Sequence, residues 1–169
     1  MRSKGFDGMV CSIAGVMAAI GDRWGLLILR DLVLGLSRYD DFRRSSGITN
    51  ATLSDRLKHL EAYGLVERRR YQTNPERFEY LLTPAGRQIA PLMPVFAQIG
   101  DRLNFSGADA PPMTFVNSKT GAEIRFCFID QSTGEPVPPQ DLAITAGSGA
   151  DDLVRWRLSH GGRGHPKNS

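Results

Sequence analysis

The sequence is poor in the side chains that build most catalytic and metal sites. Only three histidines (His59, His160 and His165) and two cysteines (Cys11 and Cys127) occur among 169 residues. It has no C-x-x-C pair, no H-E-x-x-H helix, no phosphate-binding G-x-x-x-x-G-K-[ST] loop and no G-x-S-x-G turn. Because no set of reactive groups is assembled, we expect neither an enzyme nor a metal site nor a bound cofactor.

The sequence also lacks an apolar run of the roughly 18 residues that a membrane span requires. The most apolar N-terminal stretch, residues 9–20, is preceded by Asp7 and closed by G-D-R at 21–23 without an A-x-A-like cleavage site. Two cysteines are too few for a disulfide framework and suit a reducing compartment. We therefore expect a cytoplasmic protein with no membrane partner.

Charge is unevenly distributed along the chain. The net charge is +3, but residues 1–105 hold 15 basic against 11 acidic residues, whereas the remainder holds 6 against 7. A basic excess confined to one part of a chain is what a phosphate-facing surface requires. A solvated charged surface would give the same counts, so charge alone leaves both interpretations open.

A helical pattern with one apolar stripe follows Thr49. Leu53, Leu57 and Leu60 recur at helical spacing, and Gly64 ends the pattern. Thr49 is a good N-cap, and a capped N-terminus offers backbone N–H groups to a phosphate. The opposite face is small and polar, which suits a helix that enters a DNA groove. The candidates for reading base edges are Asn50, Ala51, Ser54, Asp55, Arg56 and Lys58.

Two β-leaning runs, 66–71 and 77–82, follow this helix and are joined by the turn-rich pentad Q-T-N-P-E. They predict a two-stranded hairpin. A shorter helical pattern precedes Gly47, so the order is helix, turn, helix and basic hairpin, which predicts a winged helix-turn-helix. The candidates for phosphate or minor-groove contacts are Arg38, Arg43, Arg44, Arg68, Arg69, Arg70 and Arg77.

Helices are also predicted on both sides of this motif. Residues 11–20 form an amphipathic helix, and residues 23–34, capped by Asp22, are apolar nearly all round and therefore form the central core helix. Thr83 and Pro84 begin a long helix that Pro91 and Pro94 should bend. Its apolar residues alternate steps of four and three, a heptad pattern suited to a partner, with a core of the same chain as the alternative: Ala85, Ile89, Leu92, Phe96, Ile99 and Leu103.

The composition changes at Ser106. Three β-leaning runs, 113–117, 123–129 and 142–145, predict a small β-rich appendage over 106–146, which should dock on the first domain or on a partner subunit. The tail 147–169 is rich in Gly, Ser and Asp and is predicted to be disordered apart from a turn at 153–158. The expected fold is mainly α with a small β-wing, a winged helix-turn-helix domain over 1–105 followed by the β appendage.

Five motifs occur in order along the first domain. They are Cys11, G-D-R-W-G-L-L-I-L-R-D-L at 21–32, R-Y-D-D-F at 38–42, L-S-D-R-L-K-H-L-E-A-Y-G-L-V-E-R at 53–68, and F-E-Y-L-L-T-P-A-G at 78–86. Together they resemble the HxlR-type transcriptional regulators, relatives of the MarR-like winged-helix proteins. The resemblance extends from about Cys11 to Leu103.

The resemblance implies a homodimer that binds double-stranded DNA at a palindromic operator. In the family the first and last helices form the dimer interface, which here implies Ile13, Val16, Met17, Ile89, Leu92, Phe96, Ile99 and Leu103. Some members sense oxidants through a cysteine at the place of Cys11, so a redox signal or a small-molecule effector is expected. A helix N-terminus would favour the thiolate of Cys11, but a small buried cysteine with no redox role is the alternative.

Two further alternatives stay open. Arg56 can pair with Asp41 or another nearby acid instead of contacting a base. The winged helix can also serve as a protein- or RNA-interaction module without a specific operator, because a fold does not fix its function.

Overall fold

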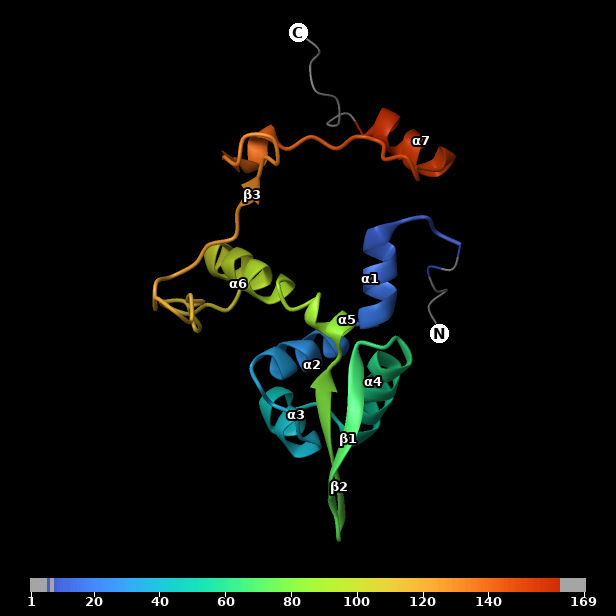
Figure 1. Ribbon diagram of the computed structural model, residues 1–169, viewed down its shortest axis with the longest axis vertical. Helices are drawn as coiled ribbons and strands as arrows, with labels where there is room; N and C mark the ends of the chain where they lie inside the picture. Colours follow the sequence, from blue (N-terminus) through green and yellow to red (C-terminus); the bar gives the residue numbers. More distant parts are fainter. Residues whose placement is uncertain (1–5, 7, 162–169) are drawn as a thin grey trace. The chain divides into compact units, whose positions relative to one another are not determined.

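The computed structural model describes residue 6 and residues 8–161 of the chain. It divides into two compact units: a first unit, Ser12–Phe96, and a second unit that holds Gly8–Cys11 and the chain from Ala97 onward. The elements follow the order α1 (Ser12–Ile20), α2 (Arg23–Val33), α3 (Tyr39–Ser46), α4 (Asn50–Ala62), β1 (Val66–Thr73), β2 (Glu76–Leu82), α5 (Pro84–Arg87), α6 (Leu92–Leu103), β3 (Phe128–Ile129), β4 (Pro136–Val137), a 3-10 turn (Pro139–Asp141) and α7 (Asp152–His160) (Figure 1).

Helix α2 is the central helix of the first unit, as the sequence predicts. Asp22 caps it, because its Oδ1 accepts hydrogen bonds from the backbone N–H groups of Trp24 at 2.9 Å and Gly25 at 3.1 Å. Ile28 and Leu29 are almost wholly buried in the core. A helix that presents apolar side chains in most directions is stable only when other elements surround it, and α3, α4 and β2 all contact it.

The two helices of the predicted motif meet where the sequence places the turn. Gly47 ends α3 in the left-handed conformation, with φ at +69°, and its N–H bonds to the carbonyl of Arg43. Thr49 caps α4, since its hydroxyl accepts from the N–H of Thr52 at 3.3 Å. The leucine stripe of α4 is fully buried, with Leu53, Leu57 and Leu60 inside the core. The predicted helix-turn-helix is therefore confirmed.

A buried carboxylate joins α2 to α3. Asp31 is completely buried, and its Oδ1 accepts hydrogen bonds from the guanidinium of Arg30 at 2.7 Å and the hydroxyl of Ser45 at 2.9 Å. Its Oδ2 has no hydrogen-bond partner among the residues that the structure describes. A buried charge must be paired to be tolerated, so this contact fixes the angle at which α3 leaves the core.

Strands β1 and β2 form the antiparallel wing, each a little longer than predicted. Val66 pairs with Leu82 near the core and Thr73 pairs with Glu76 at the turn, with a bulge between Arg70 and Gln72. The hairpin extends beyond α3 and α4 (Figure 1). Only the end that carries Val66 is buried, so most of the wing is available to a partner.

The prediction of one long helix after the wing is wrong. Thr83 caps only a single turn, α5, and a new helix, α6, begins at Leu92. Pro91 disfavours a helical conformation in the residue before it, so the chain breaks there. Pro94 lies in the first turn of α6, where an N–H has no partner within the helix, so it is tolerated without a bend. Ile89 lies in this break.

Ile89, one of the residues predicted for the dimer interface, packs inside its own chain. It is 9% exposed and belongs to the core cluster of the first unit, together with Met93. Leu92 is half-buried against the same cluster. The heptad pattern combined residues of two separate helices, and its first members pack within their own chain.

The second unit differs from the predicted appendage. Of the three predicted strands only Phe128–Ile129 is one, paired with Pro136–Val137, while Val116 and Glu123 form a single bridge. Residues 142–145 are not a strand. Where a turn in a disordered tail was expected, the structure has helix α7, capped by Asp151. Residues 162–169 of that predicted tail lie outside the described residues.

Among the described residues no single helix has the length and apolar character of a membrane span. Helices α1 and α2 reach that length only when taken together, and they are bent by 80° at the break between them.

Candidate nucleic-acid interface

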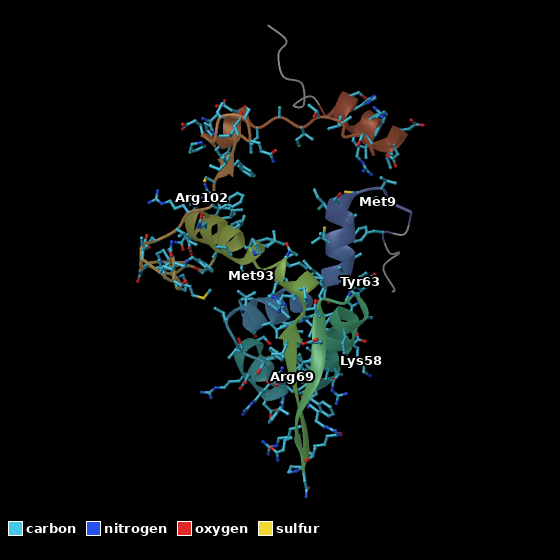
Figure 2. All side chains as sticks on the ribbon, in the orientation of Figure 1. Met9, Lys58, Tyr63, Arg69, Met93 and Arg102 are labelled. Carbon is cyan, nitrogen blue, oxygen red and sulfur yellow. The ribbon has the colours of Figure 1, made fainter. Side chains whose placement is uncertain are left out.

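The outward face of α4 is polar and accessible. Asn50, Ala51, Asp55 and Lys58 are all exposed, whereas the leucine stripe of the same helix is buried. Figure 2 shows Lys58 on the outer side of α4. The four exposed side chains are short or flexible, so a base edge can approach the helix closely. The predicted set of base-reading candidates is thus mostly on one surface.

Ser54 is the exception, because it is half-buried beside α3. Its hydroxyl lies 2.8 Å from the hydroxyl of Tyr39, which also donates to the carbonyl of Asn50 at 2.8 Å. Tyr39 therefore holds the first turns of α4 against α3. Asn50 and Ser54 follow Tyr39 by 11 and 15 positions in the sequence, so no local sequence pattern predicts these two hydrogen bonds.

Arg56 pairs with two acids, which is one of the two alternatives that the sequence left open. Its guanidinium lies 2.9 Å from the carboxylate of Asp22 and 3.0 Å from that of Asp55, not against Asp41. The side chain is 28% exposed. Because Asp22 is the N-cap of α2, Arg56 ties α4 to the start of the core helix.

Arginines dominate the wing, and three of them have partners within it. Arg69 pairs with Glu79 at 2.8 Å and Arg70 with Glu76 at 3.2 Å. Arg68 stacks its guanidinium on the ring of Phe78, 3.5 Å from the centroid. Arg77 is exposed and has no ion pair among the described residues.

These wing pairs are weak enough to be exchanged for a phosphate. Arg70 and Glu76 are both 55% exposed, and an exposed ion pair contributes only about 0–1 kcal/mol. Arg69 is 62% exposed, although its partner Glu79 is only 20% exposed. The nitrogen-tipped side chains that line the hairpin in Figure 2 are therefore free to reorient toward a polyanion.

A groove separates α4 from the inner face of the wing. It has a volume of about 440 Å³ and is lined by Tyr39, Ser54, Leu57, Lys58, Glu61, Arg68, Phe78 and Tyr80. Burial raises the pKa of the Tyr80 hydroxyl above its ordinary value, although the nearby Arg68 opposes this shift. The charged side chains of its lining are Lys58 and Glu61 on α4 and Arg68 on β1. Sequence reasoning missed the groove, since it forms only when the wing folds beside α4.

Helix α3 and the residue before it add three further basic side chains. Arg44 is exposed, and Arg43 makes only a long 3.9 Å contact with Asp40. Arg38 lies just before α3, with its guanidinium 5.1 Å from the centre of the Tyr71 ring. Its backbone also bridges to Glu79 of β2, so Arg38 connects the start of α3 to the wing.

His59 links α4 to α1. Its Nε2 lies 2.9 Å from the carbonyl oxygen of Ala18, and its ring stacks on Tyr63. Gly21 passes directly beside it with φ at +90°, so that a Cβ there would meet the His59 ring at 3.1 Å. His59 therefore forms a contact between two helices that lie far apart in the sequence.

Apolar side chains are exposed on α1 and on α6. Ile13, Val16 and Met17 on α1 are open to solvent, as are three residues of α6: Phe96, Ile99 and Leu103. Cys11 immediately precedes α1 and is partly exposed, and neither it nor Cys127 is in a disulfide. Six of the eight residues predicted for the dimer interface are thus exposed, whereas Leu92 is half-buried and Ile89 is buried.

Comparison with known proteins identifies the family. The family model described as HxlR-like helix-turn-helix matches residues 19–105. The chain belongs to this family. Rv3095 of Mycobacterium tuberculosis, an uncharacterised HTH-type transcriptional regulator, is 33% identical over 138 residues, which cover 82% of this chain and 87% of that protein. The HxlR-type resemblance is confirmed, and this member is a DNA-binding transcriptional regulator with a helix-turn-helix.

Solved structures support the winged-helix fold. PA1607, described as a candidate transcription factor, superimposes with a TM-score of 0.73 at 27% identity and covers 85% of this chain and 100% of its own. The redox regulator HypR in its reduced form gives a TM-score of 0.53 at 29% identity over 57% of this chain and 96% of its own. The mainly α fold with a small β-wing is confirmed.

Proposed function

We propose that this HxlR-family regulator acts as a homodimer on a palindromic operator, with one α4 helix in the major groove of each half-site. The supporting observation is the pairing of a polar outward face on α4 with an arginine-rich wing in one rigid unit. Such a unit has the two parts that a winged helix uses on DNA, namely a helix for the major groove and a hairpin for the backbone or minor groove.

The contacts divide by role. Thr49 and the exposed α4 residues Asn50, Ala51, Asp55 and Lys58 approach the bases or the nearest phosphate, while Ser54 and Arg56 position the helix through their own partners. The remaining arginines contact phosphates: Arg38, Arg43, Arg44, Arg68, Arg69, Arg70 and Arg77. Base contacts supply sequence preference and phosphate contacts supply affinity.

The homodimer is proposed to form through the exposed apolar faces of α1 and α6. Exposed apolar patches of this kind on a regulator mark an association surface. Because a two-fold dimer presents the same element twice, half-sites are expected one helical turn apart, about 10–10.5 base pairs.

The test is a titration of the reduced protein with a labelled fragment from upstream of its own gene, with random duplex as competitor and at two salt concentrations. The proposal predicts saturable binding that survives the competitor. Asn50→Ala should cost about 1–3 kcal/mol at one base position, whereas the control Lys119→Ala, in an exposed turn of the second unit, should change nothing. Absence of any binding would instead favour the protein-interaction module.

Redox control through Cys11 is a second proposal. It rests on the likeness to HypR, which is named a redox regulator, and on the position of Cys11 at the start of α1, beside the exposed apolar face. Oxidation of Cys11 would change the separation of the two recognition helices, with the His59 contact to Ala18 carrying the shift from α1 to α4.

The matched pair Cys11→Ser and Cys127→Ser tests this proposal. Cys127→Ser leaves only Cys11, which should be alkylated readily at neutral pH and should still lose DNA affinity on mild oxidation. Cys11→Ser should bind DNA equally well before and after oxidation. A Cys11 that resists alkylation, or an affinity that oxidation leaves unchanged, would remove redox control and leave a small-molecule effector.

A further inference from the structure

The second unit buries none of its apolar residues. None of the hydrophobic side chains among its described residues is buried, because all the buried ones lie between Ala14 and Met93. Thirteen large apolar side chains between 97 and 161 are instead at least 40% exposed: Ile99, Leu103, Phe105, Met113, Val116, Ile124, Phe126, Phe128, Ile129, Leu142, Ile144, Leu153 and Trp156. Such a surface requires a cover.

The segment 124–129, here called the aromatic edge, holds four of these exposed side chains close together in the sequence. Phe126 and Phe128 point to the same side and contact each other edge-to-face, with ring centroids 4.9 Å apart and an interplanar angle of 82°. They are 48% and 42% exposed. A strand pair as short as β3 and β4 is not stable alone in water, so a partner must support this geometry.

Gln98 fixes the aromatic edge on α6. Its Oε1 accepts from the N–H of Phe126 at 3.0 Å, and its Nε2 donates to the carbonyl of Ile124 at 3.3 Å. On a helix Gln98 is rotated by about 100° from Ile99 and by about 140° from Leu103. The edge is therefore tied to a side of α6 away from those two residues and leaves them open.

The second unit as a whole exposes enough apolar area for a stable association. Its thirteen large side chains, four of which lie in the aromatic edge, are about half exposed and present on the order of 1,000 Å² of apolar surface, and a standard interface buries about 800 Å² on each partner. PA1607 matches over its whole length and covers 85% of this chain, which is more than the family region 19–105. The likeness therefore extends into the second unit.

We propose that the aromatic edge of each chain packs against a second copy of the chain, so that the appendage forms part of the dimer interface. This inference rests on the proposed homodimer. A second copy fits because the aromatic edge and the exposed Ile99 and Leu103 of α6 belong to one unit, joined through Gln98. A self-complementary patch is buried twice in a two-fold dimer.

Sedimentation equilibrium of the full chain over a range of concentrations tests this proposal. Phe126→Ser with Phe128→Ser should raise the dimer dissociation constant at least about 30-fold, since two large apolar side chains leave the interface. Arg125→Ala, an exposed change in the same segment, is the matched control and should leave the constant within about two-fold. Circular dichroism should show the native helix content in both.

Gln98→Ala supplies a second variant that keeps both phenylalanines. Loss of the two hydrogen bonds frees the aromatic edge from α6, so the dissociation constant should rise, by less than in the double variant. A dissociation constant that neither variant changes would overturn the inference, and a fall in the free energy of unfolding with no change in dimerisation would place the edge on its own chain.

The outcomes separate this inference from the proposed function. A native chain that dimerises and binds its operator, but is insensitive to the phenylalanine changes, contradicts only the role of the aromatic edge. A native chain that stays monomeric at every concentration contradicts both that role and the homodimer.

Discussion

Both units of the chain contain large apolar side chains, but only the first unit buries them. Its core joins α2, α3, α4 and the base of the wing around side chains such as Phe42 and Leu57, which are almost completely inaccessible. In the second unit hairpins and α7 are held by turn hydrogen bonds and caps, such as Asp130 with Ser132 and Asp151 with Val154. Local hydrogen bonds shape a segment, whereas burial supplies most of its stability.

This difference separates what each unit contributes to the regulator. A self-sufficient core keeps α4 and the wing in a fixed relation, which DNA recognition requires. The second unit has regular local structure but no hydrophobic core among its described residues, which suits a surface that becomes buried only when two chains associate. If burial distinguishes the two units in this way, matched changes in them should have unequal effects on stability and on DNA binding.

The largest contrast is expected from two phenylalanines. Phe42→Ala should lower the free energy of unfolding by about 3–5 kcal/mol, because it leaves a cavity in the core. Phe105→Ala, at a side chain that is 82% exposed, should change it by less than about 0.5 kcal/mol. Urea unfolding measures both, and equal losses would contradict the difference between the units.

Two N-caps give the next contrast. Asp22→Ala removes the cap of α2 and the partner of Arg56, and should lower the free energy of unfolding by about 1–2 kcal/mol. Asp151→Ala removes the cap of α7 and should fray that helix alone. Hydrogen exchange resolves the two effects: protection should fall throughout the first unit in the former variant and only in α7 in the latter.

Two exposed arginines compare the units in DNA binding. Arg77→Ala in the wing should reduce the slope of log affinity against log salt by about one unit, because one phosphate contact is lost. Arg125→Ala in the second unit should leave the slope unchanged. Titrations at four salt concentrations measure both slopes. A slope that changes in Arg125→Ala but not in Arg77→Ala would mean that the second unit, not the wing, contacts the DNA.

The smallest contrast is in pH dependence. Burial raises the pKa of Tyr80, so the folded state holds this proton more tightly than the unfolded state, and stability should fall as the pH rises above about 10. Tyr80→Phe should remove that part of the decline. Hydrogen bonds from Ser132 lower the pKa of Asp130, but this carboxylate is fully exposed, so Asp130→Asn should leave acid unfolding of the first unit unchanged.

Much of the first unit could be predicted from the sequence because its signals are local. The caps at Asp22, Thr49 and Thr83, the leucine stripe of α4 and the turn between the wing strands each depend on residues a few positions apart. The basic side chains of the wing were assigned correctly to its strands, although their pairing with Glu76 and Glu79 was not foreseen.

The remaining features depend on distant contacts. Arg56 meets Asp22 across 34 residues, and His59 meets Ala18 across 41, distances at which periodicity gives no information. The heptad pattern after Thr83 suggested one helix, because spacing alone does not distinguish a bent helix from two helices. In the second unit, alternation of apolar residues predicted strands that lack neighbouring strands to pair with.

The most direct test of the central claim is a hydroxyl-radical footprint of the reduced protein on DNA from upstream of its own gene. If α4 reads bases in a dimer, two protected half-sites should lie about 10–10.5 base pairs apart, and Asn50→Ala should abolish that protection while salt-sensitive non-specific binding remains. Uniform protection along the fragment, equal for the native protein and for Asn50→Ala, would contradict a reading role for α4.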